Sequence, residues 1–349
     1  MWDLSLSASE VEAVRALTRQ IALKHKSIED GQFMRRAAVY AHELPRRLRQ
    51  FFNDFKLLEP TCGFCVVSGY PIDDAKIGKT PPHWKWKLDA AASLEEQIVF
   101  VLYACLLGDP FAWTTQQDGY LMHDVFPIET NRDEQLSTGS EQTLWWHTED
   151  AFHPHRADYI GLMCLRNHDQ VPTTIGAPDL SLLSKEQIDV LFEPRYLILP
   201  DESHSEKNES ELRKQFREQA DNGTIGSAYE KIKELSGTKV PILFGSRKTP
   251  YVCLDPHFTK PLDDEAGAAL NALAQAVDAS LQEIVLQPGD CCFIDNYRIV
   301  HGRKAFKARF DGTDRWLKRL NLTRNLRSSQ ATHRVQYASD HLIGKYAIR

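Results

Sequence analysis

The chain has 349 residues, with 42 Lys and Arg against 48 Asp and Glu, which gives a formal charge of −6 and a pI near 6.1. This balance offers no basic field for nucleic acid or an anionic membrane surface. No stretch approaches the roughly 18 uninterrupted apolar residues of a membrane span, and the N-terminus lacks the basic start and apolar run of a secretory signal. Seven scattered cysteines, an odd number, indicate reduced thiols, so we expect a cytoplasmic protein.

The first third of the chain is predicted to be mainly helical. Ser7-Ala8-Ser9-Glu10 is a capping box, and the apolar stripe that follows predicts a helix from about 8 to 25. A second helical stretch is expected over 30–55, broken near Pro45. After a β-rich segment at 63–70, Ser93-Leu94-Glu95-Glu96 opens a capped helix whose run 98–107 is apolar nearly all round, which indicates burial. Residues 75–90 are expected to be an exposed loop.

Strands interrupted by helices are predicted for the rest of the chain. A hairpin is expected from 240–244 and 251–255, and a turn at 287–290 launches a strand that leads to His301. The polar stretch 201–227 is expected to be another exposed loop. Further strands are predicted at 158–165, 196–199, 291–295 and 314–323, and helices after Ser184 and over 262–281. With no repeat and no composition break, a single domain is expected.

His147 and Glu149, in Leu144-Trp145-Trp146-His147-Thr148-Glu149-Asp150, form the most informative motif. Residues two apart share a face of a β-strand, so this imidazole and carboxylate can bind one ion. Val300-His301-Gly302 supplies a third candidate ligand. Two imidazoles and one carboxylate form the facial triad that is typical of non-haem Fe(II) oxygenases and leaves positions open for chemistry. A zinc hydrolase can use the same ligands with a bound water.

The strand predicted at 314–323 carries arginines on one face. Arg315, Leu317 and Arg319 share that face with Asn321 and Thr323. If it is buried, each guanidinium needs an anion, because an unpaired buried ion is costly. Carboxylates match the planar guanidinium, so two arginines beside an iron site suggest two carboxylate-bearing small molecules. The alternative is an edge strand with solvated arginines.

Three segments and Arg315 together resemble the clavaminate synthase-like family of Fe(II)/2-oxoglutarate oxygenases. The segments are His147-Thr148-Glu149-Asp150-Ala151-Phe152-His153-Pro154, Gly161-Leu162-Met163-Cys164-Leu165-Arg166-Asn167 and Asp295-Asn296-Tyr297-Arg298-Ile299-Val300-His301-Gly302-Arg303. Within the family, the chain looks most like the bacterial hydroxylases of free arginine, lysine, asparagine and enduracididine, over roughly residues 60–325. The resemblance implies an α+β fold: a double-stranded β-helix (jelly-roll) core over 61–325 with flanking helices, after a helical extension over 1–60, in one oxygenase domain spanning 1–349.

The resemblance also implies the cofactors and the reaction. His147, Glu149 and His301 would bind Fe(II), and Arg315 would bind the distal carboxylate of 2-oxoglutarate, a cofactor site to which Thr174 is also assigned. The implied reaction uses O2, decarboxylates 2-oxoglutarate to succinate and hydroxylates a C–H bond near the α-carbon of a free amino acid, most often C3. Because a carboxylate stands at 149 rather than Ala or Gly, no site is vacated for chloride, and halogenation is not expected.

Substrate contacts follow from the same resemblance. Arg319 would hold the α-carboxylate of the amino acid, and Gln116, favoured over Gln117 by its spacing from His147, would contact the substrate backbone. Ser137 corresponds to a serine near the guanidinium in arginine oxygenases. Glu149 can also accept a hydrogen bond from the substrate amine through its non-ligating oxygen.

Asp255 corresponds to an acid that recognises the substrate side chain in relatives. A buried carboxylate there would select a cation or an amide donor and reject an apolar side chain. Several arginine and lysine relatives carry Asp-x-Asp where this chain has Cys253-Leu254-Asp255, so one arm of the guanidinium clamp is missing. Arginine or an arginine-like amino acid is expected, with lysine, asparagine and cyclic guanidino amino acids open. The structural alternative for Asp255 is a turn residue ahead of Pro256.

Other features have competing interpretations. Cys62-Gly63-Phe64-Cys65 has redox CxxC spacing, but it enters a strand rather than a helix N-terminus, which favours packing. His153 and His155 are predicted to support or cover the site rather than bind metal. A desaturase or cyclase of the same family and a non-catalytic jelly roll remain alternatives. The sequence does not indicate an oligomeric state.

Overall fold

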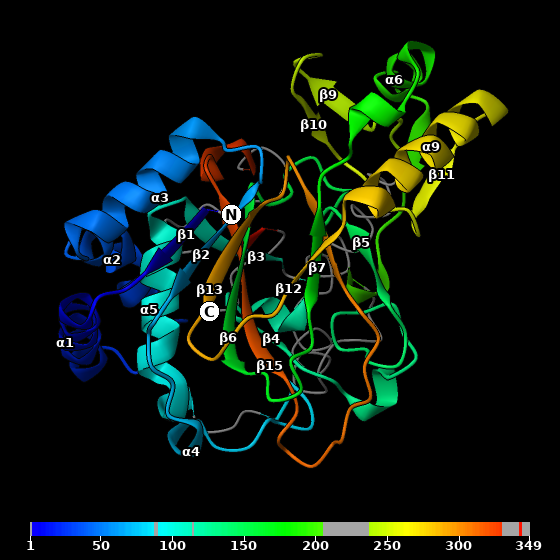
Figure 1. Ribbon diagram of the computed structural model, residues 1–349. Coiled ribbons are helices and arrows are strands. Elements are labelled where there is room, and N and C mark those ends of the chain that lie inside the picture. Colours follow the sequence, from blue (N-terminus) through cyan, green and yellow to red (C-terminus); the bar gives the residue numbers. More distant parts are fainter. Residues whose placement is uncertain (1, 87–89, 114, 205–236, 330–341, 344–349) are drawn as a thin grey trace, which may run out of the picture.

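Two β-sheets with helices on their outer sides form the body of the protein (Figure 1). The computed structural model describes residues 2–86, 90–113, 115–204, 237–329 and 342–343. Within these residues the larger sheet has the order β1-β2-β13-β6-β15-β3-β16, with β4 also paired to β15. Its strands are β1 (Trp2–Ser5), β2 (Phe64–Ser68), β3 (Asp109–Trp113), β4 (His123–Val125), β6 (Tyr159–Arg166), β13 (Cys291–Asp295), β15 (Trp316–Thr323) and β16 (Leu342–Ile343).

The smaller sheet carries two of the candidate metal ligands. Its order is β12-β7-β14-β5, and neighbouring strands in it are antiparallel. The strands are β5 (Leu144–His147), β7 (Thr173–Gly176), β12 (Gln282–Ile284) and β14 (Val300–Arg303). Two short antiparallel pairs lie outside both sheets: β8 (Tyr196–Ile198) with β11 (Thr259–Pro261), and β9 (Leu243–Gly245) with β10 (Pro250–Val252).

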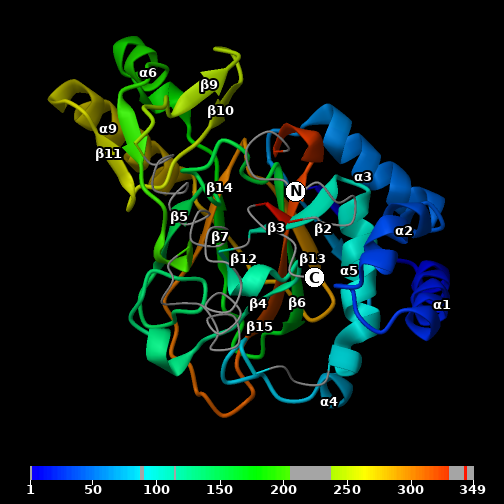
Figure 2. The same ribbon diagram turned by 180° about the vertical axis from the view of Figure 1, so that it is seen from behind.

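Helices cover the outer face of each sheet, as both views of the ribbon show (Figures 1 and 2). On the larger sheet lie α1 (Ala8–Lys24), α2 (Gly31–Ala41), α3 (Arg46–Leu58) and α5 (Leu94–Cys105). Beside the smaller sheet lie α6 (Lys185–Leu191) and α9 (Asp264–Ser280), and the short α4 (Asp74–Ile77) lies at one end. None of the described helices has the length and apolar character needed to cross a membrane.

Local signals explain where these helices begin. Ser7 forms the predicted capping box with Glu10, and Ser184, where a helix was predicted to begin, forms one with Gln187. Pro45 separates α2 from α3 as expected. Ser93 precedes α5, but its side chain makes no capping bond and accepts a hydrogen bond from Gln97 instead. The middle of α5 is buried all round, as its composition predicted, because it packs between α1, α2 and the larger sheet.

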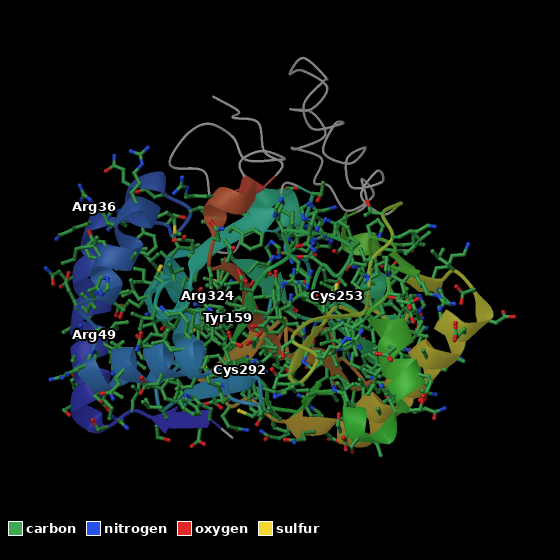
Figure 3. All side chains as sticks on the ribbon, turned by 90° about the horizontal axis from the view of Figure 1, so that it is seen from above. Arg36, Arg49, Tyr159, Cys253, Cys292 and Arg324 are labelled. Atoms are coloured by element: carbon green, nitrogen blue, oxygen red, sulfur yellow. The ribbon has the colours of Figure 1, made fainter. Side chains whose placement is uncertain are left out.

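Three apolar clusters follow from the alternation of side chains along the strands. In β13, Phe293 faces the helices while Cys292 and Ile294 face the smaller sheet. A second cluster fills the space between the sheets, and a third lies between the smaller sheet, α6 and α9. Gly161 of β6 allows close packing, since a Cβ there would lie 2.9 Å from Phe100 of α5. Seen from above, Arg36 and Arg49 lie at the outer edge of the helical layer, whereas Tyr159 and Cys292 lie inside (Figure 3).

The arginine-bearing strand is an interior strand. β15 pairs with β6 along one edge and with β3 and β4 along the other, and all eight of its residues are buried. Trp316, Leu320 and Leu322 face the helices, whereas Leu317 faces the space between the sheets. The edge-strand alternative with solvated arginines is therefore wrong.

The expected loops differ in part from the structure. The expected loop at 75–90 begins within α4, and 87–89 lie outside the described residues. Most of the predicted loop 201–227 also lies outside them, with only 201–204 described. Cys62 and Cys65 are free thiols: Cys65 is buried in β2, and Cys62 donates to the Phe64 carbonyl. The packing interpretation of the CxxC is confirmed.

Candidate active site

The three predicted ligands converge at the end of the smaller sheet. His147 and His301 are directly paired across β5 and β14. The Oε2 atom of Glu149 lies 3.6 Å from Nε2 of His147 and 3.4 Å from Nε2 of His301. Ligand atoms of all three residues lie within 4.8 Å of one another. This spacing leaves room for one ion between two imidazole nitrogens and a carboxylate.

Glu149 is held by contacts other than strand pairing. β5 ends at His147, so Glu149 lies just beyond the strand and not within it as the sequence suggested. Thr148 continues the extended path by bonding the backbone of Leu254 in both directions. The backbone N–H of Glu149 donates to Asn296 Oδ1 over 2.8 Å, and the Asn296 amide donates to the Glu149 and Ala157 carbonyls over 3.0 and 2.9 Å.

The Nδ1 hydrogen bond of His147 suits metal binding through Nε2. Nδ1 of His147 lies 2.8 Å from the Trp145 carbonyl, so it carries the proton and leaves Nε2 free to coordinate. Burial opposes charging of this imidazole, but the hydrogen bond and charge of Glu149 raise its pKa to about 9. Although burial would raise the pKa of Glu149, Arg319 and the two imidazoles hold it well below its usual range. A divalent cation would replace these protons, so the donor set fits Fe(II).

Arg315 and Arg303 are two buried guanidiniums without a carboxylate partner among the described residues. Arg315 donates to Thr173 Oγ1 over 2.9 Å, and its Nε has no hydrogen-bond partner in the described part of the chain. Arg303 donates to the carbonyls of Ser140 and Lys304. Burial lowers the pKa of Arg315 to about 10, and burial together with the charge of Arg315 lowers that of Arg303 to about 9. Both line the cavity, so an anion is needed there.

Arg319 already has partners in the structure. Its Nη1 pairs with Oε1 of Glu149, and its Nη2 lies 3.2 Å from Gln116 Oε1 and 2.9 Å from His123 Nδ1. The non-ligating oxygen of Glu149, which the sequence interpretation assigned to the substrate amine, therefore meets Arg319 here. The predicted choice of Gln116 agrees with the geometry, because Gln117 bonds the backbone of Asp124 while Gln116 bonds Arg319.

One cavity brings together the triad, the arginines and the predicted substrate residues. Ser137 and Asp255 line it with His147, and so does Trp145, which is half exposed. Both interpretations of Asp255 hold geometrically: its Oδ1 accepts from the backbone of His257 and Phe258 as a turn residue does, and it also faces the cavity. Burial raises the pKa of Asp255, opposed by His147.

Position 253, where several relatives carry the first aspartate of Asp-x-Asp, does not contribute to the cavity. Cys253 is buried in the apolar cluster beside α9, where its thiol donates to the Ala151 carbonyl, and it is not among the cavity-lining residues. Asp201 lines the cavity instead, and its negative charge further raises the pKa of Asp255. The sequence interpretation missed Asp201 because it placed residues 201–227 in an exposed loop.

Thr174 requires a correction. It pairs with Gly302 in the β7–β14 register, and its Oγ1 lies on the side of β7 where a Cβ of Gly302 would project. Thr173 is the residue that bonds Arg315 and lines the cavity. His153 and His155 do not line the cavity: the His153 ring makes an edge-to-face contact with Trp113, and its Nδ1 accepts from the His155 backbone N–H.

A buried polar network lies behind Glu149 and Gln116. Asp150, at a positive φ of 50°, accepts from Trp113 Nε1, Gln116 Nε2 and His204 Nε2 at 2.5, 3.3 and 2.9 Å. His204 also bonds Thr115 over 2.7 Å. The network fixes the neighbour of the candidate metal ligand Glu149 and ties the segment before residue 205 to the site.

Comparison with known proteins agrees with this geometry. Residues 87–321 match the family model described as taurine catabolism dioxygenase TauD, TfdA family. The chain is 44% identical to an enduracididine beta-hydroxylase of Streptomyces hygroscopicus, over 97% of this chain and 100% of that protein. It is 42% identical to an L-ornithine/L-arginine 3-hydroxylase of Catenulispora acidiphila, over 95% and 97% of the two chains.

A solved structure extends the likeness to the fold. The non-heme iron oxygenase OrfP, in complex with Fe, succinate and (3S)-hydroxy-L-Arg, superposes with a TM-score of 0.89 at 44% identity, over 98% of this chain and 99% of that chain. These similarities to hydroxylases show that the zinc-hydrolase and non-catalytic alternatives are wrong. The protein is an enzyme that belongs to the TauD/TfdA family of dioxygenases.

Proposed function

We propose that this protein hydroxylates C3 of free L-arginine or an arginine-like amino acid, using Fe(II), 2-oxoglutarate and O2. One oxygen atom enters the substrate C–H bond, and the other enters succinate as 2-oxoglutarate loses carbon dioxide. The observation that carries the proposal is the distribution of charge in one cavity. Unpaired guanidiniums and two acids line it together with the triad, so it suits a dicarboxylate beside the metal and a cationic amino acid.

The residues of the cofactor site have separate roles in this proposal. His147, Glu149 and His301 hold Fe(II), which when bound activates O2 for attack on an unreactive C–H bond. Arg315 binds the distal carboxylate of 2-oxoglutarate, with the Thr173 hydroxyl orienting its guanidinium. Thr173 thereby takes the role that the sequence interpretation gave to Thr174.

The substrate is held at both ends. Arg319, oriented by Gln116, binds the α-carboxylate, and the acid of Asp255 faces the side chain. Asp201 supplies a second carboxylate for the cationic end of the substrate side chain. Ser137 lines the same cavity. Fixing both ends presents one carbon to the metal, which makes the selectivity positional.

The proposed architecture is a double-stranded β-helix within a single domain. The two sheets enclose the cavity in the manner of a double-stranded β-helix, with the core at 61–325 and the helices of residues 1–60 packed on its outside. A single apolar cluster supports one domain over 1–349, since it includes Val14, Phe33 and Phe52 of those helices together with Phe293 and Leu320 of the larger sheet.

A panel of free L-amino acids tests the function. Arginine, ornithine, lysine, asparagine, leucine and a cyclic guanidino amino acid would each be incubated with Fe(II) and 2-oxoglutarate, with product mass and succinate as readouts. We expect arginine or the cyclic guanidino amino acid to gain one oxygen atom fastest, and leucine not to react. Preferred turnover of asparagine or leucine would contradict the proposal.

Two histidine variants connect the panel to the site. His147→Ala should lose both substrate oxidation and 2-oxoglutarate turnover, because a ligand is removed. His155→Ala is the matched control, since His155 lies eight residues further on but does not line the cavity. Equal activity in both variants would remove His147 from the ligand set.

A further inference from the structure

His123 places an imidazole at the cavity wall that the assigned site does not use. It is the first residue of β4 and lies directly opposite Arg319 of β15. Opposed residues in an antiparallel pair share one face, so its side chain lies on the same face as Arg319. The pair two residues along, Val125 and Leu317, also lines the cavity. The His123 side chain is buried, with 2% of the residue exposed.

The tautomer of His123 is determined by its neighbour. Nη2 of Arg319 lies 2.9 Å from Nδ1 of His123, and a guanidinium can only donate, so Nδ1 accepts. The neutral ring must then carry its proton on Nε2. That atom is buried and has no hydrogen-bond partner among the described residues. A buried N–H without an acceptor is costly, and cavity-lining residues commonly leave such groups for a ligand.

The position of His123 along the sheet indicates which of the two small molecules it would contact. Arg315, which the proposed function assigns to the 2-oxoglutarate carboxylate, directly precedes β15 and is four residues from Arg319, a separation of roughly 13 Å at about 3.3 Å per residue. His123 lies beside Arg319 and therefore at the amino-acid end of the cavity. Arg319 uses Nη1 for Glu149 and Nη2 for Gln116 and His123, which leaves its Nε without a partner among the described residues.

We propose that the Nε2–H of His123 donates a hydrogen bond to the carboxylate of the amino-acid substrate beside Arg319. This inference rests on the proposed function and names a further residue for its substrate site. A carboxylate has two oxygens, and Arg319 and His123 offer one unused donor each. His123 thus has two roles that use different nitrogens: Nδ1 orients Arg319, and Nε2 binds the substrate.

Two substitutions separate these roles. In His123→Asn, the side-chain oxygen can replace Nδ1 as acceptor for Arg319, but no donor reaches the position of Nε2. In His123→Gln, the longer side chain returns an N–H donor near the position of Nε2. Each variant and the wild type would be measured with the preferred amino acid of the panel and with its carboxamide, which has no carboxylate.

We expect kcat/KM for the amino acid to fall roughly ten- to hundred-fold in His123→Asn, mainly through KM, and to recover largely in His123→Gln. The preference for the acid over its carboxamide should shrink in His123→Asn, because part of that preference is the lost bond. The 2-oxoglutarate requirement should change far less. The Co(II) affinity and the unfolding midpoint serve as measures of an intact site.

Failure of this inference is distinguishable from failure of the proposed function. If the wild type oxidises an amino acid and His123→Asn retains both its KM and its preference for the acid, then His123 only orients Arg319. A rise in the 2-oxoglutarate requirement that matches the rise in amino-acid KM would also overturn the assignment, since the donor would then serve the cofactor. If the wild type oxidises no amino acid of the panel, the proposed function fails, and this inference fails with it.

Discussion

Asn296 connects the backbone of the candidate metal ligand Glu149 to the segment that leads to His301, and its removal tests how the triad is held. Its side chain is fully buried and forms three hydrogen bonds, two to the backbone of Glu149 and one to the Ala157 carbonyl. Asn296→Ala leaves one N–H and two carbonyls without this partner. At about 1 kcal/mol net for each bond, the free energy of unfolding should fall by about 3 kcal/mol.

The effect on the metal site should be additional and specific. Glu149 lies beyond the end of β5, so these bonds replace the strand pairing that fixes His147. Loss of a group that orients a ligand commonly lowers metal affinity by roughly ten- to hundred-fold. We expect a decrease of that size for Co(II) in Asn296→Ala, measured by calorimetric titration of the folded protein.

Asn167 provides a matched control. It is also a buried asparagine whose side chain accepts from one backbone N–H, that of Val171, and donates to two carbonyls, those of Val171 and Leu286. Asn167→Ala should lower stability by a similar amount, measured by urea unfolding, and leave Co(II) affinity unchanged. Equal Co(II) affinity in the two variants would refute the argument, because Asn296 would then stabilise the fold without orienting Glu149.

Three further predictions concern charge. Arg315→Ala should raise the 2-oxoglutarate requirement by roughly ten- to hundred-fold and the amino-acid requirement much less; steady-state kinetics with each reactant varied would show the reverse if the two arginine roles are exchanged. Asp255→Asn should cost ~2 to 5 kcal/mol in kcat/KM for arginine-type substrates while neutral amino acids lose little, and equal losses for both would contradict its role. Burial raises the pKa of Asp295 to about 7. The free energy of unfolding should therefore fall by at most about 4 kcal/mol as pH rises from about 4 to about 7, because the folded state holds the proton more tightly. Urea unfolding of Asp295→Asn should lack this part of the loss, and identical pH profiles of the two proteins would refute the prediction.

Much of the fold was predictable because local and tertiary preferences agree. The capping box at Ser7 and the apolar stripe of α1 specify the same helix, the first through local hydrogen bonds and the second through packing. The burial of α5 could be recognised from its composition. The candidate triad was predictable because imidazole and carboxylate side chains are themselves metal-binding groups, and the HxE spacing places two of them together. The burial of both faces of β15 was not, since the face with Arg319, Asn321 and Thr323 is polar in sequence and yet is buried.

The remaining site residues depend on pairing that sequence spacing does not contain. Thr173 and Thr174 are adjacent and chemically identical, and a shift of one residue moves a strand side chain to the other face. His123 belongs to the site only because β4 pairs with β15 opposite Arg319. Arg303 could have been found, because it follows His301 by two residues and so shares its side of β14.

The structure gives a physical reason for a cysteine rather than an aspartate at position 253. The thiol lies in an apolar cluster and bonds a carbonyl, so an aspartate in that side-chain position would bury an unpaired charge. In the proposed substrate site the second acid is Asp201, whose Oδ1 accepts from Ser203 Oγ at 2.5 Å. Ser203 Oγ in turn accepts from Gln116 Nε2 at 2.7 Å, and Gln116 accepts from Arg319, which pairs with Glu149. Hydrogen bonds therefore run without a break from Asp201 to Glu149, the carboxylate of the candidate metal site. Because Gln116 and Arg319 lie within that chain, the segment at 201–204 helps to set the geometry of both ends of the proposed substrate site.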